Sequence, residues 1–198
     1  MSSVTYKHDQ LPQSVISLLE TGKYVHLGTA NEDAIPEVSL MNYYYLPSKE
    51  LYSPEAEEEG PEVDVISKQH TYVILASSKL SLKYKNISVN PHVSLLFHDW
   101  TTAKSNFKAP SDNSEDQSNI LTLLKNLNQS ELSRVSATLS GLARIVSNGA
   151  ELNYYKTKLL KENPEAKVYI DGDENAIILV KITSAKVCDE QNNFTVYH

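Results

Sequence analysis

The chain has 198 residues, of which 40% are hydrophobic and 22% are charged, and its formal net charge is −7. This length and composition predict a soluble globular protein with one large domain. The negative charge argues against binding to nucleic acids or anionic membranes by general charge attraction.

The cysteine content and the N-terminal segment bear on the compartment. Cys188 is the single cysteine, so an intramolecular disulfide cannot form, which favours a reducing compartment. The first 23 residues lack the long apolar core of a signal peptide, and no apolar run approaches the ~20 residues needed to cross a bilayer. We therefore expect a cytoplasmic protein, whose size also permits entry into the nucleus.

The hydrophobic pattern predicts short helices and longer strands. Apolar residues at helical spacing after Pro12 predict a helix that ends at Gly22. Runs rich in β-branched and aromatic residues predict six strands, at residues 24–31, 37–46, 71–77, 92–100, 136–147 and 176–189. Further helices are predicted at residues 81–89, 119–127 and 151–162. Gly141 lies inside the fifth strand, where it predicts a bulge or a tight bend.

The order of these elements predicts the fold class. The strands follow one another without regular helices between them, and the sequence has no G-x-G-x-x-G or Walker-type glycine loop. This favours a mainly β protein, a six-stranded antiparallel barrel with peripheral helices, over a doubly wound parallel sheet. We expect a single domain over residues 1–198, with an acidic hairpin insertion at 47–70 and a polar insertion with a short helix at 101–130.

The segment SSKLSLK, at residues 77–83, joins a predicted strand to a predicted helix. A helix N-terminus offers free backbone N–H groups and a partial positive charge, which suit an anion such as phosphate. Serine hydroxyls can add donors, and Lys83 in the first turn is unfavourable unless an anion offsets its charge. Alternatively, Ser81 only caps the helix and the lysines form a solvated face. The residue types alone leave both interpretations open.

The pattern S-S-x-x-S-x-K-x-x-N-I-x-x-N-P-x-V-S-L-L-F, at residues 77–97, resembles the signature of the pyridoxamine phosphate oxidase-like FMN-binding split-barrel family. The order of elements over residues 10–189 is similar to that family as well, with YVHLGTAN and IPEVSLMNYYYL before the signature and LSGLARIV after it. The resemblance implies a split barrel that forms a homodimer, with FMN in the groove between the two subunits.

The resemblance also implies which residues hold the cofactor. Together with the predicted anion site, it gives an FMN-binding set of Ser39, Leu40, Met41, Asn42, Ser77, Ser78, Ser81, Lys83 and Ser136. The chain departs from the family pattern at three positions, where Leu82 and Ser39 replace arginines and Ser136 replaces a glutamine. Arginine binds phosphate through two parallel hydrogen bonds, whereas Lys83 binds it as a point charge.

The second phosphate site of the family's oxidases, which takes pyridoxamine phosphate, is altered. The resemblance places Tyr154, Lys158 and Glu162 at positions where those oxidases have Tyr, Arg and Ser. Glu162 would repel a phosphate, and the oxidases' C-terminal Trp and Arg-x-His elements are missing. We therefore predict that the chain does not oxidise vitamin B6, although Tyr154 and Lys158 are retained as predicted substrate residues.

Three functions stay open at this point. The first is an FMN-dependent oxidoreductase of unknown substrate, in which no catalytic side chain is assigned. The second is a non-catalytic protein that kept the fold and binds flavin or another ligand. The third is a haem-binding split barrel, for which the sequence offers no clear axial ligand. A metal site is not expected, because His92 and His98 lie about 20 Å apart along one strand.

Overall fold

The computed structural model describes residues 4–7, 11–53, 70–98, 136–147, 149–188 and 193–198. The glutamate cluster of the predicted acidic insertion and the helix predicted at 119–127 lie outside the described residues. No helix in the described ranges is both long enough and apolar enough to cross a membrane.

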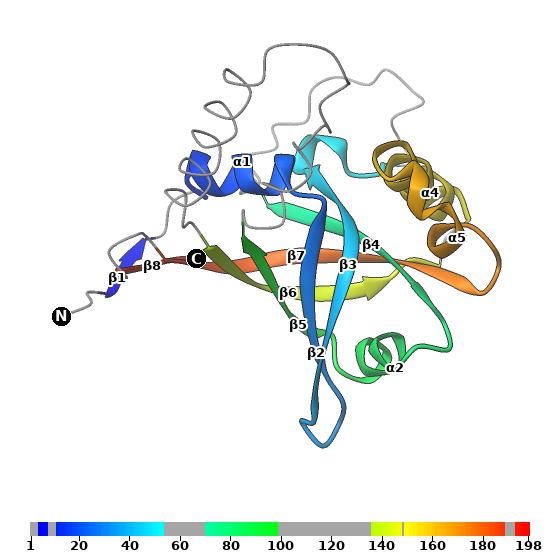
Figure 1. Cartoon of the computed structure of the whole chain (residues 1–198), viewed down its shortest axis with the longest axis horizontal. Coiled ribbons are helices and arrows are strands. Elements are labelled where there is room, and N and C mark those ends of the chain that lie inside the picture. Colours follow the sequence, from blue (N-terminus) through cyan, green and yellow to red (C-terminus); the bar gives the residue numbers. More distant parts are fainter. Residues whose placement is uncertain (1–3, 8–10, 54–69, 99–135, 148, 189–192) are drawn as a thin grey trace, which may run out of the picture.

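Six antiparallel strands form a closed barrel (Figure 1). They are β2 (Tyr24–Ala30), β3 (Pro36–Pro47), β4 (Thr71–Ser78), β5 (His92–His98), β6 (Ser136–Ile145) and β7 (Asn175–Cys188). Neighbouring strands run in the order β7-β4-β3-β2-β5-β6, and pairing of β6 with β7 closes the ring. The predicted fold class is confirmed, and the strand bounds differ from the predicted ones by at most two residues at each end.

Helices close the ends of the barrel and cover one side of it. The predicted helices are α1 (Gln13–Thr21), α2 (Leu82–Val89) and α4 (Gly149–Glu162). Three short elements were not predicted, namely η1 (Ser48–Glu50), η3 (Pro164–Ala166) and α5 (Lys167–Ile170). Leu19 of α1 and Ile87 of α2 join the interior core, whereas α4 and α5 lie against the outside of the sheet (Figure 1).

Two terminal strands extend the sheet beyond the barrel. β8 (Phe194–Tyr197) pairs antiparallel with the last residues of β7, and β1 (Val4–Lys7) pairs parallel with β8. Both lie beside the chain ends, away from α2 (Figure 1). These strands were not predicted, because four-residue runs carry too little pattern to be recognised before their partner is known.

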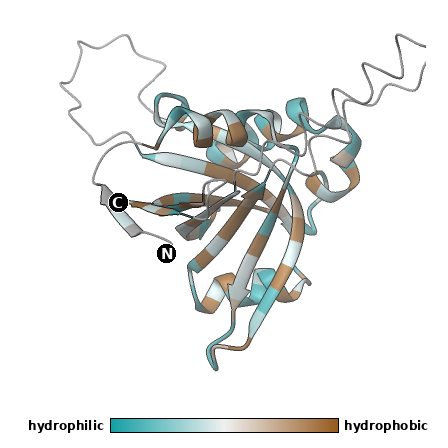
Figure 2. Cartoon of the chain, turned by 60° about the vertical axis from the view of Figure 1, so that its left-hand side comes forward, coloured by the Kyte–Doolittle hydropathy of each residue, from teal (hydrophilic) through white to brown (hydrophobic). Residues whose placement is uncertain are grey.

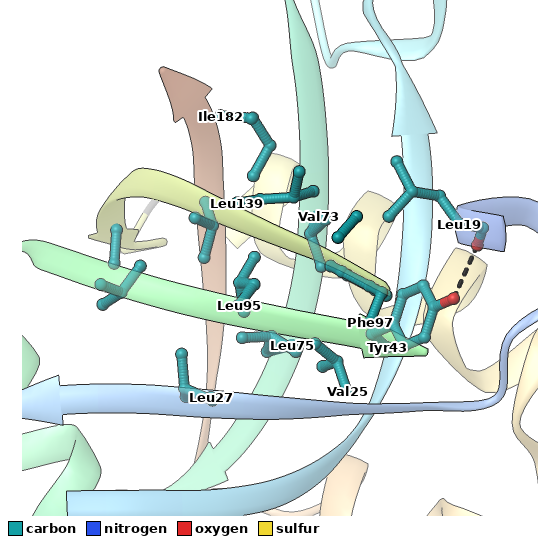
Figure 3. Packing of buried hydrophobic residues seen from close by; sticks show 14 of the residues in the cluster. Leu19, Val25, Leu27, Tyr43, Val73, Leu75, Leu95, Phe97, Leu139 and Ile182 are labelled. Atoms are coloured by element: carbon teal, nitrogen blue, oxygen red, sulfur yellow. Dashed lines mark hydrogen bonds between the residues drawn. The ribbon is translucent and has the colours of Figure 1, made fainter. Parts of the chain in front are cut away.

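The burial pattern of each strand reflects how many of its faces are covered. In β4, Val73 and Leu75 point into the barrel interior, whereas Ile74 and Ala76 pack beneath α4, η3 and α5. The middle of the strand, residues 73–76, is therefore continuously apolar. In β2 every second residue is buried, because no helix of the described part of the chain covers its outer face. Figure 2 shows hydrophobic and hydrophilic positions alternating along such strands, and Figure 3 shows the interior core.

Gly141 lies at an irregularity in the β6–β7 pair, as predicted. The register shifts between Ser140 and Gly141. A Cβ atom at residue 141 would lie 2.6 Å from the Cγ1 of Val180 and 2.9 Å from the carbonyl oxygen of Lys181. The close approach of these two strands therefore requires glycine at this point.

The buried hydroxyl of Tyr43 anchors α1 to the barrel, and its removal should be measurable. This hydroxyl donates a hydrogen bond of 2.7 Å to the carbonyl oxygen of Leu19 (Figure 3), and burial raises the pKa of Tyr43. We expect Tyr43→Phe to lower the free energy of unfolding by about 1–2 kcal/mol, because the Leu19 carbonyl loses a buried donor. Urea unfolding measures this effect, with Tyr169→Phe at an exposed tyrosine as the control. Equal losses in the two variants would contradict the anchoring role.

Candidate functional site

The turn between β4 and α2 is shaped by its own serines. The backbone N–H of Ser81 donates to the carbonyl oxygen of Ser78 at 3.1 Å, and Ser78 Oγ accepts from the N–H of Leu80 at 3.2 Å. Ser81 Oγ accepts from the N–H of Tyr84 at 3.3 Å, so Ser81 is the N-cap of α2. The capping role considered from the sequence is confirmed, and it leaves the first N–H groups of the helix directed at the turn.

The two lysines of this turn have different environments. The Nζ atom of Lys79 donates to the carbonyl oxygen of Asp173 at 2.6 Å, so this lysine is engaged with the loop before β7. Lys83 instead lines a pocket next to Ser77 and Ser81, whose hydroxyl oxygens are 2.8 Å apart. Lys83 is thus the lysine placed to bind an anion at the start of α2.

This candidate pocket has a volume of about 320 Å³ and lies between the turn, β3 and the α4–α5 region. It gathers seven of the nine residues predicted to hold FMN, namely Leu40, Met41, Asn42, Ser77, Ser78, Ser81 and Lys83. Its remaining wall is formed by Ala76, Leu159, Ala166, Tyr169, Ile170 and Asn175. That these residues bind a cofactor stays a prediction, but the fold brings them to one place.

The lining of the candidate pocket is polar and cationic at one end and apolar at the other. Lys83 is the one charged side chain among the described residues that line it, in a protein whose net charge is −7. Leu159 and Ile170 form an apolar wall, and the adjacent Tyr169 is 69% exposed. The arrangement suits a ligand with an anionic group at one end and a flat, less polar body.

Two predicted cofactor residues do not line this pocket. Ser39 Oγ donates to a carboxylate oxygen of Glu37 at 3.3 Å, on the face of β3 opposite to Leu40. Ser136 pairs with Cys188 at one end of β7, whereas Asn175 lines the pocket at the other end. These two ends of β7 are thirteen residues apart, which corresponds to ~43 Å along the strand at ~3.3 Å per residue. Within one chain, Ser136 therefore lies far from Lys83.

The two predicted substrate residues contact η1 instead of opening into the candidate pocket. Lys158 Nζ lies 2.6 Å from a carboxylate oxygen of Glu50, which also accepts a hydrogen bond of 3.0 Å from the hydroxyl of Tyr44. The hydroxyl of Tyr154 donates to the backbone carbonyl of Glu50 at 3.0 Å. Glu50 thus supplies the carboxylate that Lys158 binds, and an incoming phosphate would have to displace it.

The Glu50–Lys158 pair sets a prediction for pH dependence. The hydrogen bond that Lys158 donates to Glu50 is the largest cause that lowers the pKa of Glu50 below the ordinary value of 4.5. A carboxylate with a lowered pKa stabilises the fold above its unfolded pKa and loses that contribution as the pH falls through its folded pKa. We expect Glu50→Gln to cost about 0.5–1 kcal/mol at pH 7 and nothing once Glu50 is protonated.

Urea unfolding of both proteins between pH 7 and pH 3 measures this convergence. Glu32→Gln, at an exposed turn, is the control and should differ from the wild type by less than about 0.5 kcal/mol throughout. A difference between Glu50→Gln and the wild type that stays constant down to pH 3 would contradict the ion pair.

A larger pocket of about 470 Å³ lies farther along β3, where the ends of α1 and α4 approach the strand. Three glutamates line it, at residues 20, 50 and 162, together with Tyr43, Tyr44 and Tyr45. Lys23, the one lysine in the described part of its lining, is paired with Glu165 at 2.7 Å. The excess of carboxylates makes this larger pocket unsuitable for a phosphate, so volume alone does not identify the anion site.

The sequence reasoning missed the wall that η3, α5 and the start of β7 contribute. Asn175 Nδ2 donates to the carbonyl oxygens of Val168 and Asp171, which ties the single turn of α5 to β7. Lys156 adds an ion pair of 2.6 Å with Asp171. The Asn163-Pro164 break signals where α4 ends, but a four-residue helix has no periodicity that could have revealed Tyr169 as a pocket residue.

Comparison with known proteins finds close sequence relatives, although no protein-family profile matches the chain. A pyridoxamine 5'-phosphate oxidase homolog of Saccharomyces cerevisiae is 38% identical over 200 residues, covering 96% of this chain and 95% of the relative. A homolog of the same description from Schizosaccharomyces pombe is 34% identical over 196 residues, covering 98% and 93%. Among solved structures, the heme storage protein HutZ from Vibrio cholerae has a TM-score of 0.52 at 14% identity, covering 88% of this chain and 92% of HutZ, which shows a shared fold.

Proposed function

Because the chain belongs to the family of pyridoxamine 5'-phosphate oxidase homologs, we propose that it binds FMN, with the phosphate at the Ser77–Lys83 turn. The observation that supports this most is the candidate pocket, where the one charged side chain from the described residues is a lysine at the N-terminus of α2. The donors there are the kind that a phosphate needs, namely an ammonium group, hydroxyls and free helix N–H groups. The residues present therefore fit the cofactor.

Each part of the candidate pocket has its own task in this proposal. Lys83 neutralises the phosphate and Ser81 keeps α2 directed at it. Leu40 and Asn42 project from one face of β3 along the middle of the pocket, and Tyr169 offers an aromatic surface against which a flat ring can lie. When bound, FMN supplies a redox centre that accepts a hydride from a donor molecule.

We propose that the protein is a flavin-dependent oxidoreductase whose substrate is not pyridoxamine phosphate. The carboxylate of Glu50 is already paired with Lys158, the residue that would bind the substrate's phosphate, and Glu162 adds a further carboxylate to that region.

We further propose a homodimer in which the second copy covers the outer face of β2, β3, β5 and β6. This face exposes apolar side chains, namely Val38 (69%), Leu40 (56%), Leu96 (37%) and Leu142 (40%). Leu40 belongs both to this face and to the candidate pocket, so a partner on the face would border the ligand. Ser136 projects from the same outer face as Leu96 and is then placed to reach the pocket of the other chain. Light scattering after size exclusion measures the expected dimer mass.

The visible absorption spectrum of the purified protein tests the proposal directly. A flavin spectrum, with FMN identified after denaturation, would support it, and NADH and NADPH would then be tried as donors. A bound flavin that stays oxidised with every donor would favour a non-catalytic flavin-binding protein. A colourless protein that also fails to bind added FMN would overturn the proposed cofactor, and a haem spectrum would replace it.

A further inference from the structure

Asn163 is a buried amide that links the candidate pocket to the end of α4. Asn163 is 2% exposed, and its Nδ2 donates to the carbonyl oxygens of Leu159 at 3.2 Å and Tyr43 at 3.1 Å. Because a carbonyl oxygen can only accept, these two bonds fix which end of the amide carries the nitrogen. The Oδ1 atom of Asn163 therefore faces its other neighbour, the side chain of Asn42.

The orientation of Asn163 determines that of Asn42. Asn42 Nδ2 donates to Asn163 Oδ1 at 3.1 Å, and Asn42 lines the candidate pocket between β3 and α4. With its nitrogen held in this way, Asn42 has its carbonyl oxygen left to accept a hydrogen bond from a ligand. The chain of bonds runs from two backbone carbonyls through Asn163 to the pocket.

We infer that Asn163 is a positioning residue that makes Asn42 a hydrogen-bond acceptor and so selects ligands with an N–H or O–H donor at that point. The inference rests on the proposed FMN site. FMN has donors of both kinds, the imide N–H of its ring system and the hydroxyls of its ribityl chain. A ligand with only an acceptor there would bury two acceptors against each other and bind less tightly.

The ligand-free protein already distinguishes positioning from simple support. We expect the side-chain amide of Asn42 to exchange its hydrogens slowly in ¹⁵N-labelled wild-type protein and rapidly in Asn163→Ala. The Asn42→Ala variant assigns the signal by removing it. Unchanged exchange of the Asn42 amide in folded Asn163→Ala would overturn the inference. If Asn163→Ala does not fold, Asn163→Ser is measured in its place, because the shorter serine side chain cannot reach the Asn42 amide.

A double-mutant cycle on FMN affinity gives the second readout, by titration of flavin fluorescence. Asn42→Ala and Asn163→Ala are each expected to weaken binding about five- to tenfold, and the double variant is expected to be no weaker than Asn42→Ala. If Asn163→Ala lowers affinity by the same factor with and without Asn42, or lowers only the Tm, its role is structural and the inference fails. If wild-type protein binds no FMN, the proposed function fails, and the amide-exchange experiment still decides whether Asn163 positions Asn42.

Discussion

Lys83→Glu is expected to weaken FMN binding by at least about a hundredfold while leaving the fold intact. Among the described residues that line the candidate pocket, the change replaces the one cation with an anion at the N-terminus of α2. A charge-assisted contact to phosphate is lost, and repulsion of similar size takes its place. Fluorescence titration with FMN measures the affinity, and circular dichroism checks that the helix and barrel remain.

Lys85→Glu is the matched control for this change. Lys85 lies two residues further along α2, is exposed and does not line the candidate pocket, so the net charge changes equally while the local contact does not. We expect its effect on FMN affinity to be less than about threefold at physiological salt. If both variants bind FMN as the wild type does, or if both lose it equally, the phosphate does not lie at the Ser77–Lys83 turn.

Gly141→Ala is expected to lower the free energy of unfolding by about 2–3 kcal/mol. The added methyl group would meet Val180 and the backbone of Lys181 at distances that real Cβ atoms do not show. Val180 can rotate, but the carbonyl of Lys181 belongs to the β6–β7 ladder that closes the barrel, so the strands must separate. Urea unfolding measures the loss, and the Tm should fall by roughly 5–10 °C.

Gly149→Ala provides the comparison. A Cβ atom at Gly149 would have no neighbour within 4 Å among the described residues, and alanine is the better helix former at this start of α4. This variant should be as stable as the wild type or slightly more stable. If Gly141→Ala unfolds at the same urea concentration as Gly149→Ala, the contact between β6 and β7 is looser than the structure indicates.

The barrel was predictable because its strands carry strong local patterns. The β-branched and aromatic runs identified all six barrel strands, and Pro12, Gly22 and the two Asn-Pro pairs identified helix ends. β1 and β8 could not be found in the same way, since their pairing joins the two ends of the chain and depends on register rather than composition. α5 was not predicted for a related reason, because a single helical turn is too short to show a hydrophobic periodicity.

The candidate site was predictable where one short segment builds it. The Ser77–Lys83 turn follows from a strand end, a cap and a helix start, all of which are local. Ser39 shows the limit of transferring a contiguous motif, since the next three residues line the candidate pocket whereas the Ser39 hydroxyl bonds to Glu37. Tyr169, Asn163 and Asn175 come from later elements whose approach to β3 is a property of the whole fold.

The pairing of β4 with β7 has a consequence for how the chain is made. Ser77 pairs with Ala176, about 100 residues later, so the strand that leads into the phosphate turn gains its second neighbour only when β7 has been synthesised. Until then β4 and β6 each keep an open edge, and such edges are templates for association between incomplete chains. Contacts this distant in sequence also slow folding. A ligand of the candidate pocket can therefore stabilise only chains in which β7 has already closed the ring, and it cannot protect shorter chains from association.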